Sequence, residues 1–136
     1  MIVMRKEHFE DILAHTAAAL PNEGCGLIAG TIADGVKTVE KVYLLTNIDQ
    51  SPIHFSMDPK EQFAAIKDMR ASGWVLLGNF HSHPATPSRP SAEDISLAYD
   101  PSASYLIISL ADKEQPVLKS FNIKEGSASE EQLEIH

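Results

Sequence analysis

The sequence predicts a mixed α/β domain in which a mixed sheet is flanked by helices. Several short apolar runs have the length and composition of strands, and longer segments place apolar residues at helical spacing. Gly, Pro, Asn and Asp separate most of these segments and mark turns. At 136 residues the chain predicts one domain spanning 1–136, with 124–136 as a polar, weakly patterned tail.

The first three predicted elements are a helix and the two strands of a hairpin. Apolar residues recur at helical spacing over residues 5–20, and Pro21 ends that helix. Residues 24–32 indicate a buried strand whose glycines allow close approach of the backbone. Residues 36–45 alternate as a second strand, and the Asp-Gly dipeptide between the strands is typical of a tight hairpin turn.

A loop and a second helix follow the hairpin. Residues 46–57 predict the loop. Three residues then fit the N-cap, first and third positions of a helix: Asp58, Pro59 and Glu61. We expect this helix to run to about residue 71, where Gly73 closes it.

The C-terminal half of the chain predicts three strands and a short helix. Residues 74–83 have the apolar character of a strand, and it leads directly into a pair of histidines. A short helix over 91–99 comes next. Two further apolar runs, 104–110 and 116–123, predict the last strands.

The composition fits an ordinary soluble globular protein, with 43% hydrophobic and 22% charged residues. No run of about 18 apolar residues predicts a membrane span, and no basic segment followed by an apolar core predicts a signal peptide. The single cysteine, Cys25, cannot form an internal disulfide and fits a reducing cytoplasm. The net charge of −8 argues against a nucleic-acid surface. We therefore expect a cytoplasmic protein whose partners include neither membranes nor nucleic acids.

The segment HSHPATPSRPSAED, residues 81–94, has the composition of a metal site. In a strand, side chains two residues apart point to the same face about 6.6–6.8 Å apart, so His81 and His83 can aim at one ion while Ser82 points away. A carboxylate would complete a three-ligand set and leave a fourth position for water, as in catalytic zinc sites. The nearest candidate is Asp94, and the prolines between it and the histidines restrict the connecting loop.

Ser91 and Asp94 also have a purely structural interpretation. The pattern S-x-x-D before an apolar run is a capping box, which is common at helix N-termini. The nearby histidines favour a ligand role for Asp94, and Ser91 can both cap the helix and face the site.

Two histidines in H-x-H spacing are weak evidence by themselves, but several metal-dependent families are excluded. Hydrolase barrels that use this spacing need about 250 residues. The chain has no H-E-x-x-H motif, and one cysteine cannot supply the P-C-x-x-C of a zinc deaminase. Two histidines and a carboxylate can also hold iron, so that alternative stays open.

The whole pattern, H-S-H-P followed after six residues by S-x-x-D, resembles the JAMM (MPN-plus) metalloproteases. Members of that family also carry a glutamate just before a glycine-rich strand, and NEGCGLIAG presents Glu23 there. The resemblance implies a cytidine-deaminase-like fold and one Zn²⁺ per chain, held by His81, His83 and Asp94. It implies Glu23 as the general base and Ser91 as a group that stabilises the oxyanion. Spacing alone does not separate Glu23 from the other glutamates considered: Glu40, Glu61 and Glu93.

The short length is similar to the small prokaryotic branch of the family, some members of which act on sulfur-carrier proteins. The resemblance therefore implies hydrolysis of an amide or isopeptide bond at the C-terminus of a ubiquitin-like or sulfur-carrier protein. Two alternatives remain open at this point, a non-catalytic MPN-type scaffold and a zinc hydrolase of small amides. The sequence identifies neither the true substrate nor the oligomeric state.

The remaining candidate side chains have structural interpretations. Cys25 is expected to be a small buried strand residue rather than a reactive thiol. His8 and His15 fall together on one flank of the first helix and are expected to be solvated. His54 lies in the loop and either lines a substrate groove or lies on the surface.

Overall fold

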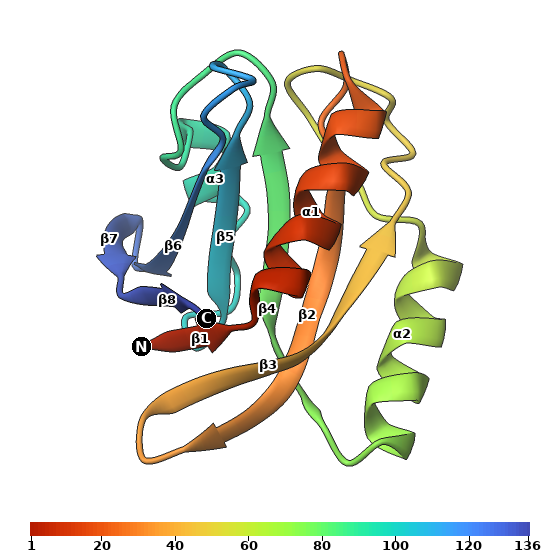
Figure 1. Cartoon of the computed structure of the whole chain (residues 1–136), viewed down its shortest axis with the longest axis vertical. Coiled ribbons are helices and arrows are strands. Elements are labelled where there is room, and N and C mark those ends of the chain that lie inside the picture. Colours follow the sequence, from red (N-terminus) through yellow and green to blue (C-terminus); the bar gives the residue numbers. More distant parts are fainter.

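The computed structural model describes all residues from 1 to 136, and the elements predicted from the sequence occur in the predicted order. In chain order the elements are β1 (Ile2–Met4), α1 (Lys6–Ala19), β2 (Cys25–Ala33), β3 (Val36–Leu45), α2 (Pro59–Ala71), β4 (Val75–His83), α3 (Ala92–Ser96), β5 (Ser104–Ser109), β6 (Val117–Lys124), β7 (Ser127–Glu131) and β8 (Leu133–Ile135). The mixed sheet flanked by helices is confirmed (Figure 1).

All the strands belong to one eight-stranded sheet, in the order β7-β6-β5-β4-β2-β3-β1-β8. Central strand β4 pairs antiparallel with β2 and parallel with β5, so both of its edges are hydrogen-bonded. β7 and β8 lie at opposite ends of the order, although only Gln132 separates them in the chain. The sheet therefore curls until its two ends meet near the N-terminus (Figure 1).

Four short elements differ from the prediction. β1 has only three residues, too few for a hydrophobic pattern, and it pairs in parallel with both β3 and β8. The polar segment 124–136 contains β7, which pairs with the neighbouring strand β6, and β8, which pairs with β1 at the other end of the chain. α3 has five residues rather than the nine expected over 91–99. Pairing with remote strands therefore decides β1 and β8, and local sequence pattern does not.

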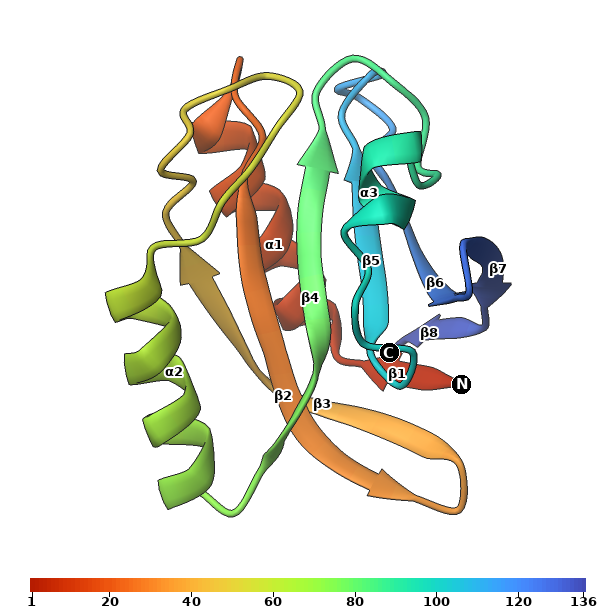
Figure 2. The ribbon, with the colours of Figure 1, turned by 180° about the vertical axis from the view of Figure 1, so that it is seen from behind.

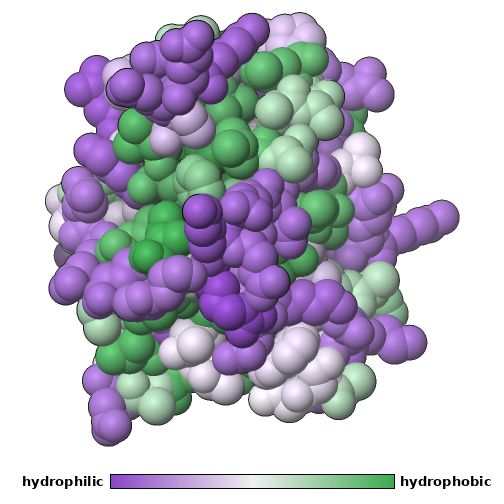
Figure 3. Space-filling model, in the orientation of Figure 1, coloured by the Kyte–Doolittle hydropathy of each residue, from purple (hydrophilic) through white to green (hydrophobic).

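The helices cover the two faces of the sheet unequally. α1 packs on one face, where its Ile12 joins a buried cluster with Ile28 and Phe80. α2 packs on the opposite face over β2 and β3, and α3 packs on that same face over β5 and β6 (Figure 2). β4 runs between α2 and α3 on this second face. The α1 face has hydrophilic side chains across its centre (Figure 3).

The predicted start of α2 is confirmed, with one difference. The Asp58 carboxylate accepts a hydrogen bond from the Lys60 amide at 2.8 Å, as an N-cap does. Glu61 does not bond back to the cap. Its carboxylate accepts from the amide and the hydroxyl of Thr46, at 2.6 and 2.9 Å. The start of the 46–57 loop is thereby tied to α2.

The prediction that His8 and His15 are solvated is wrong. His8 is only 5% exposed, and its Nδ1 accepts a hydrogen bond from the Arg5 amide. His15 Nε2 lies 3.2 Å from the Cys25 carbonyl oxygen and 2.8 Å from that of Leu45, so it donates to the backbone of both strands. His15 therefore links α1 to β2 and β3, and His8 caps the start of α1.

Candidate metal centre

The C-terminal end of β4 holds His81 and His83 on the face of the sheet that carries α2 and α3. Cys25 of β2 and Ile107 of β5 flank His81 in register, and Ser109 of β5 pairs with His83. The two histidines are 3% and 6% exposed. Because strands pair with β4 on both sides, the backbone that carries these imidazoles is rigid.

α3 directs the Asp94 carboxylate toward the histidines. Ser91 Oγ accepts a hydrogen bond from the Asp94 amide at 3.0 Å, and Asp94 Oδ2 accepts one from the Ser91 amide at 2.9 Å. The same Oδ2 lies 3.2 Å from His81 Nε2 and 3.1 Å from His83 Nε2. The capping box and the approach to the histidines therefore occur together.

The three side chains form a compact donor triangle: His81 Nε2, His83 Nε2 and Asp94 Oδ2. The two Nε2 atoms are 3.1 Å apart, whereas donors around a tetrahedral zinc ion with bonds of 2.0–2.1 Å lie about 3.3 Å from one another. His83 Nδ1 lies 2.9 Å from the Pro87 carbonyl oxygen, so Nδ1 carries the hydrogen and Nε2 presents its lone pair to the triangle. The donor set therefore fits a small divalent cation.

A hydrogen-bonded pair of residues places Glu23 beside this triangle. The Gly24 amide donates to Ser82 Oγ at 2.8 Å, and the Ser82 amide donates to the Gly24 carbonyl oxygen at 3.0 Å. Ser82, which points away from the histidines as predicted, is fully buried in this position. These bonds continue the pairing of β2 with β4 by one residue, so Glu23 lies next to the histidine pair.

The Glu23 carboxyl group is buried, and its pKa lies above the ordinary value. It is 5% exposed, and its Oε1 atom has no hydrogen-bond partner in the protein. Burial raises the pKa of Glu23 to about 8, against the opposing effect of His83 and with a further increase from Asp94. Glu23 does not belong to the converging donor atoms. It is a buried carboxyl group that can exchange a proton near neutral pH.

The electrostatics of Asp94 are opposite to those of Glu23. Burial by itself raises the pKa of Asp94, but its close interactions with His81 and His83 outweigh burial and hold the pKa well below its ordinary range. Burial lowers the pKa of His81. An ionised carboxylate at Asp94 and a neutral imidazole at His81 are the protonation states that metal ligands require.

A family model described as prokaryotic homologs of the JAB domain matches residues 5–124. The chain belongs to this family. The resemblance to JAMM proteins is therefore confirmed for this JAB-domain protein.

Two relatives are named as a peptidase and a desampylase. The JAB-domain protein is 31% identical over 135 residues to the CysO-cysteine peptidase of Mycobacterium tuberculosis, across 99% of this chain and 91% of that protein. It is 31% identical over 105 residues to the desampylase of Haloferax volcanii, across 74% of each protein.

Solved structures show the same fold. A protein of Desulfitobacterium hafniense, solved in solution, is 60% identical with a TM-score of 0.93, across 100% of this chain and 93% of that one. A structure described as a metalloprotease-like JAMM zinc site in the proteasome and signalosome has a TM-score of 0.60 at 23% identity, across 100% and 97% of the two chains. No helix of the JAB-domain protein combines the length and apolar character needed to cross a membrane.

The 46–57 loop of the JAB-domain protein reaches across to the metal centre. Its Phe55 ring stacks on the imidazole of His81, with ring centroids 4.6 Å apart and an interplanar angle of 21°. His54 Nδ1 lies 2.6 Å from the carboxylate of Glu93, the neighbour of Asp94 on α3. His54 therefore ties the loop to α3. Sequence reasoning missed Phe55, and the only available signal was an aromatic residue in a polar loop.

Cys25 is the small buried strand residue that the sequence predicts, with 0% exposure. Burial raises the pKa of its thiol to about 12, so almost no thiolate is present at neutral pH. We expect Cys25 in the native JAB-domain protein to resist iodoacetamide at pH 8 and to react fully once the protein is unfolded in guanidinium. Mass spectrometry of the alkylated chain measures both reactions. Rapid labelling of the folded protein would contradict the inert assignment.

Proposed function

We propose that the protein is a zinc-dependent peptidase that hydrolyses an amide or isopeptide bond at the C-terminus of a ubiquitin-like or sulfur-carrier protein. The observation that carries this proposal is the triangle of His81, His83 and Asp94 beside the buried carboxyl group of Glu23. The names of the relatives, CysO-cysteine peptidase and desampylase, support the substrate class. The proposal places the enzyme in the cytoplasm, where a reduced Cys25 is expected.

His81, His83 and Asp94 would hold one zinc ion per chain. Two imidazole nitrogens and one carboxylate oxygen are ligands that suit zinc, and three protein ligands are typical of its catalytic sites. When bound, zinc acts as a Lewis acid that polarises a carbonyl group and makes water more acidic. The hydrogen bond of His83 to Pro87 keeps its ring oriented toward the ion.

Glu23 would be the general base. The attacking water loses a proton as it adds to the scissile carbonyl, and Glu23 Oε1 is a buried acceptor with no other partner. The leaving amine must gain a proton as the C–N bond breaks, and the same carboxyl group can return it. The bonds between Gly24 and Ser82 hold the backbone of Glu23 in place for both transfers.

Ser91 would stabilise the oxyanion that forms on the scissile carbonyl. Its Oγ atom accepts from the Asp94 amide, which leaves the hydroxyl hydrogen free to donate. We expect Ser91→Ala to lower kcat by about 10²–10³-fold, the loss typical of one missing oxyanion donor. The lost helix cap costs about 1 kcal/mol of stability, which denaturant unfolding measures separately. Ser91→Thr keeps both the hydroxyl and the cap, and it should retain most of the activity.

The proposed function is tested with a ubiquitin-like or sulfur-carrier protein that carries one additional C-terminal residue. Zinc-loaded enzyme should shorten this protein by that residue, as intact-mass spectrometry measures. Removal of zinc by a chelator should stop the reaction, and added zinc should restore it. A carrier protein that stays intact with a fully zinc-loaded enzyme would contradict the substrate class.

A further inference from the structure

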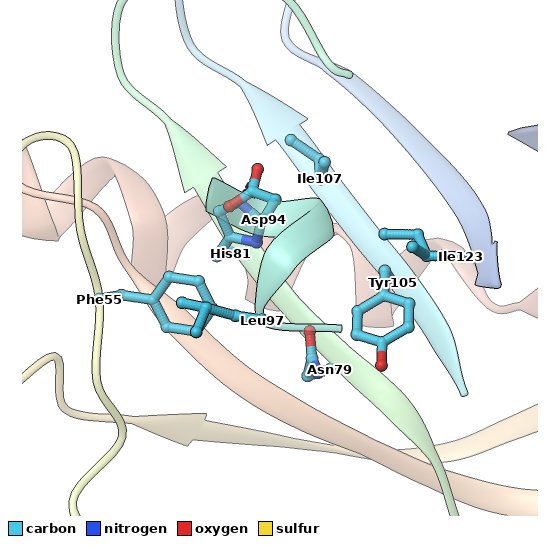
Figure 4. Close-up of a pocket in the computed structure, with 8 residues that line it drawn as sticks. All are labelled: Phe55, Asn79, His81, Asp94, Leu97, Tyr105, Ile107 and Ile123. Carbon is cyan, nitrogen blue, oxygen red and sulfur yellow. Dashed lines mark hydrogen bonds and ion pairs between the residues drawn. The ribbon is translucent and has the colours of Figure 1, made fainter. Parts of the chain in front are cut away.

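An apolar pocket adjoins the metal centre on the side of α3. Its volume is about 60 Å³, and five of the eight residues that line it are hydrophobic. The hydrophobic residues come from the 46–57 loop, the C-cap of α3, and strands β5 and β6: Phe55, Leu97, Tyr105, Ile107 and Ile123. Asn79, His81 and Asp94 complete the wall (Figure 4). The pocket therefore shares two residues with the donor triangle.

We propose that this pocket binds the apolar side chain of the substrate residue at the cleaved bond. The proposal rests on the proposed function of the metal centre. Because His81 and Asp94 are both part of the pocket wall, a side chain in the pocket belongs to a residue that touches the reacting group.

The size of the pocket indicates which side chains fit. A single water needs about 10–15 Å³ of such space, so the pocket holds about four to six water-sized groups. The four side-chain heavy atoms of leucine or methionine fill a comparable space. Leu97, at the edge of α3, is 51% exposed, and a bound apolar group would cover it.

The charges around the pocket argue against a charged occupant. Asp94 is the one acidic residue of the wall, and its Oδ2 atom already faces two imidazoles and the Ser91 amide. No lysine or arginine lines the pocket, so a substrate carboxylate would be buried without a partner. An apolar side chain has no such cost.

Asn79 supplies a polar group for the substrate backbone. It lies two residues before His81 on β4, so its side chain points to the same face of the sheet. The Asn79 side chain is half-buried and lines the pocket (Figure 4). Its carboxamide has an NH₂ group that donates and an oxygen that accepts, so it can bond to the C=O or the N–H of a residue seated in the pocket.

Methyl-labelled protein allows this proposal to be tested by NMR without measuring activity. The methyl groups of Leu97, Ile107 and Ile123 line the pocket and report on its occupant. The probes are leucinamide, which mimics the released residue, and N-acetyl-leucine, which mimics the acyl product, each with its glycine counterpart. We expect one leucine compound to shift these signals with a Kd at least about tenfold lower than that of its glycine counterpart. The compound that binds identifies the side of the cleaved bond.

Leu97→Asp should weaken binding of the leucine compound about tenfold or more, because it places a charge at the mouth of the pocket. Tyr99→Asp is the matched control, since Tyr99 is 83% exposed and does not line the pocket. Equal shifts with leucine and glycine compounds, or equal binding to both variants, would overturn the proposal. Binding of leucine by a protein that cleaves no carrier would instead support the pocket and contradict the proposed function.

Discussion

Glu23→Gln is expected to lower kcat by about 10²–10⁴-fold, the range typical of a lost general base, while the zinc content stays at one ion per chain. Glutamine keeps the size of the side chain but cannot accept the proton of the attacking water. The Glu23 carboxyl group lies outside the donor triangle, so its replacement leaves the ligands of the ion intact. Carrier-protein cleavage measured by mass spectrometry, together with metal analysis of the same preparation, separates catalysis from binding.

Glu10→Gln is the control for this substitution, because Glu10 is exposed on α1 and distant from the site in the fold. It should leave kcat unchanged. The stability of Glu23→Gln should be equal to or higher than that of the wild type above pH 8, since the substitution removes a buried carboxyl group whose pKa is raised to about 8. The unfolded carboxyl group ionises at its ordinary lower pKa, so folding of the metal-free wild type becomes less favourable as the pH rises toward 8. Full activity of Glu23→Gln would remove Glu23 from the mechanism.

Zinc is expected to stabilise the wild-type protein strongly, and His83→Ala should abolish that effect. A ligand present at a thousand times its Kd stabilises the native state by about 4 kcal/mol. For a chain of this size, that corresponds to a rise in Tm of about 10 °C or more. Removing His83 leaves two donors, and two donors hold zinc far more weakly than three. Thermal unfolding with and without zinc, followed by circular dichroism, measures the increment.

His136→Ala is the matched control, because the side chain of His136 is 65% exposed and lies at the end of the chain. Its zinc-dependent rise in Tm should equal that of the wild type. The comparison uses the increment rather than Tm itself, since His83→Ala also removes the hydrogen bond to Pro87. One zinc bound per chain to His83→Ala with unchanged affinity would show that the triangle is not the metal site.

Much of the fold could be predicted because its larger elements carry local signals. The helical spacing of residues 5–20, the alternation of 36–45 and the N-cap at Asp58 each depend on neighbours in the chain. β1 and β8 are too short to carry such a signal. They pair with strands more than 30 residues away: Ile2 of β1 lies opposite Lys37 of β3 and Leu133 of β8.

The candidate site likewise contains residues with a local sequence signal and one residue, Glu23, without such a signal. H-x-H on a strand and S-x-x-D at a helix start placed His81, His83, Ser91 and Asp94 among the candidates, because each pair is set by local geometry. Glu23 came only from the resemblance. The physical basis of its position is the Gly24–Ser82 pair, a contact between residues 58 positions apart.

Phe55 and Asn79 were absent from the sequence interpretation for a related reason. An aromatic residue in a loop and an asparagine in a strand acquire a role only when the fold places them beside the histidines. Phe55 stacks on His81, and both residues line the apolar pocket.

By itself, the sequence determined the mixed α/β class, the main helices and strands, and the chemical types of the donor atoms, since periodicity and spacing act over a few residues. The tertiary structure decided how the donors converge, that Glu23 is buried next to them, and that an apolar pocket opens beside them. The physical reason is that distances near 3 Å between Nε2 and Oδ2 atoms depend on strand pairing and helix packing. Those interactions join residues that are remote from one another in the chain.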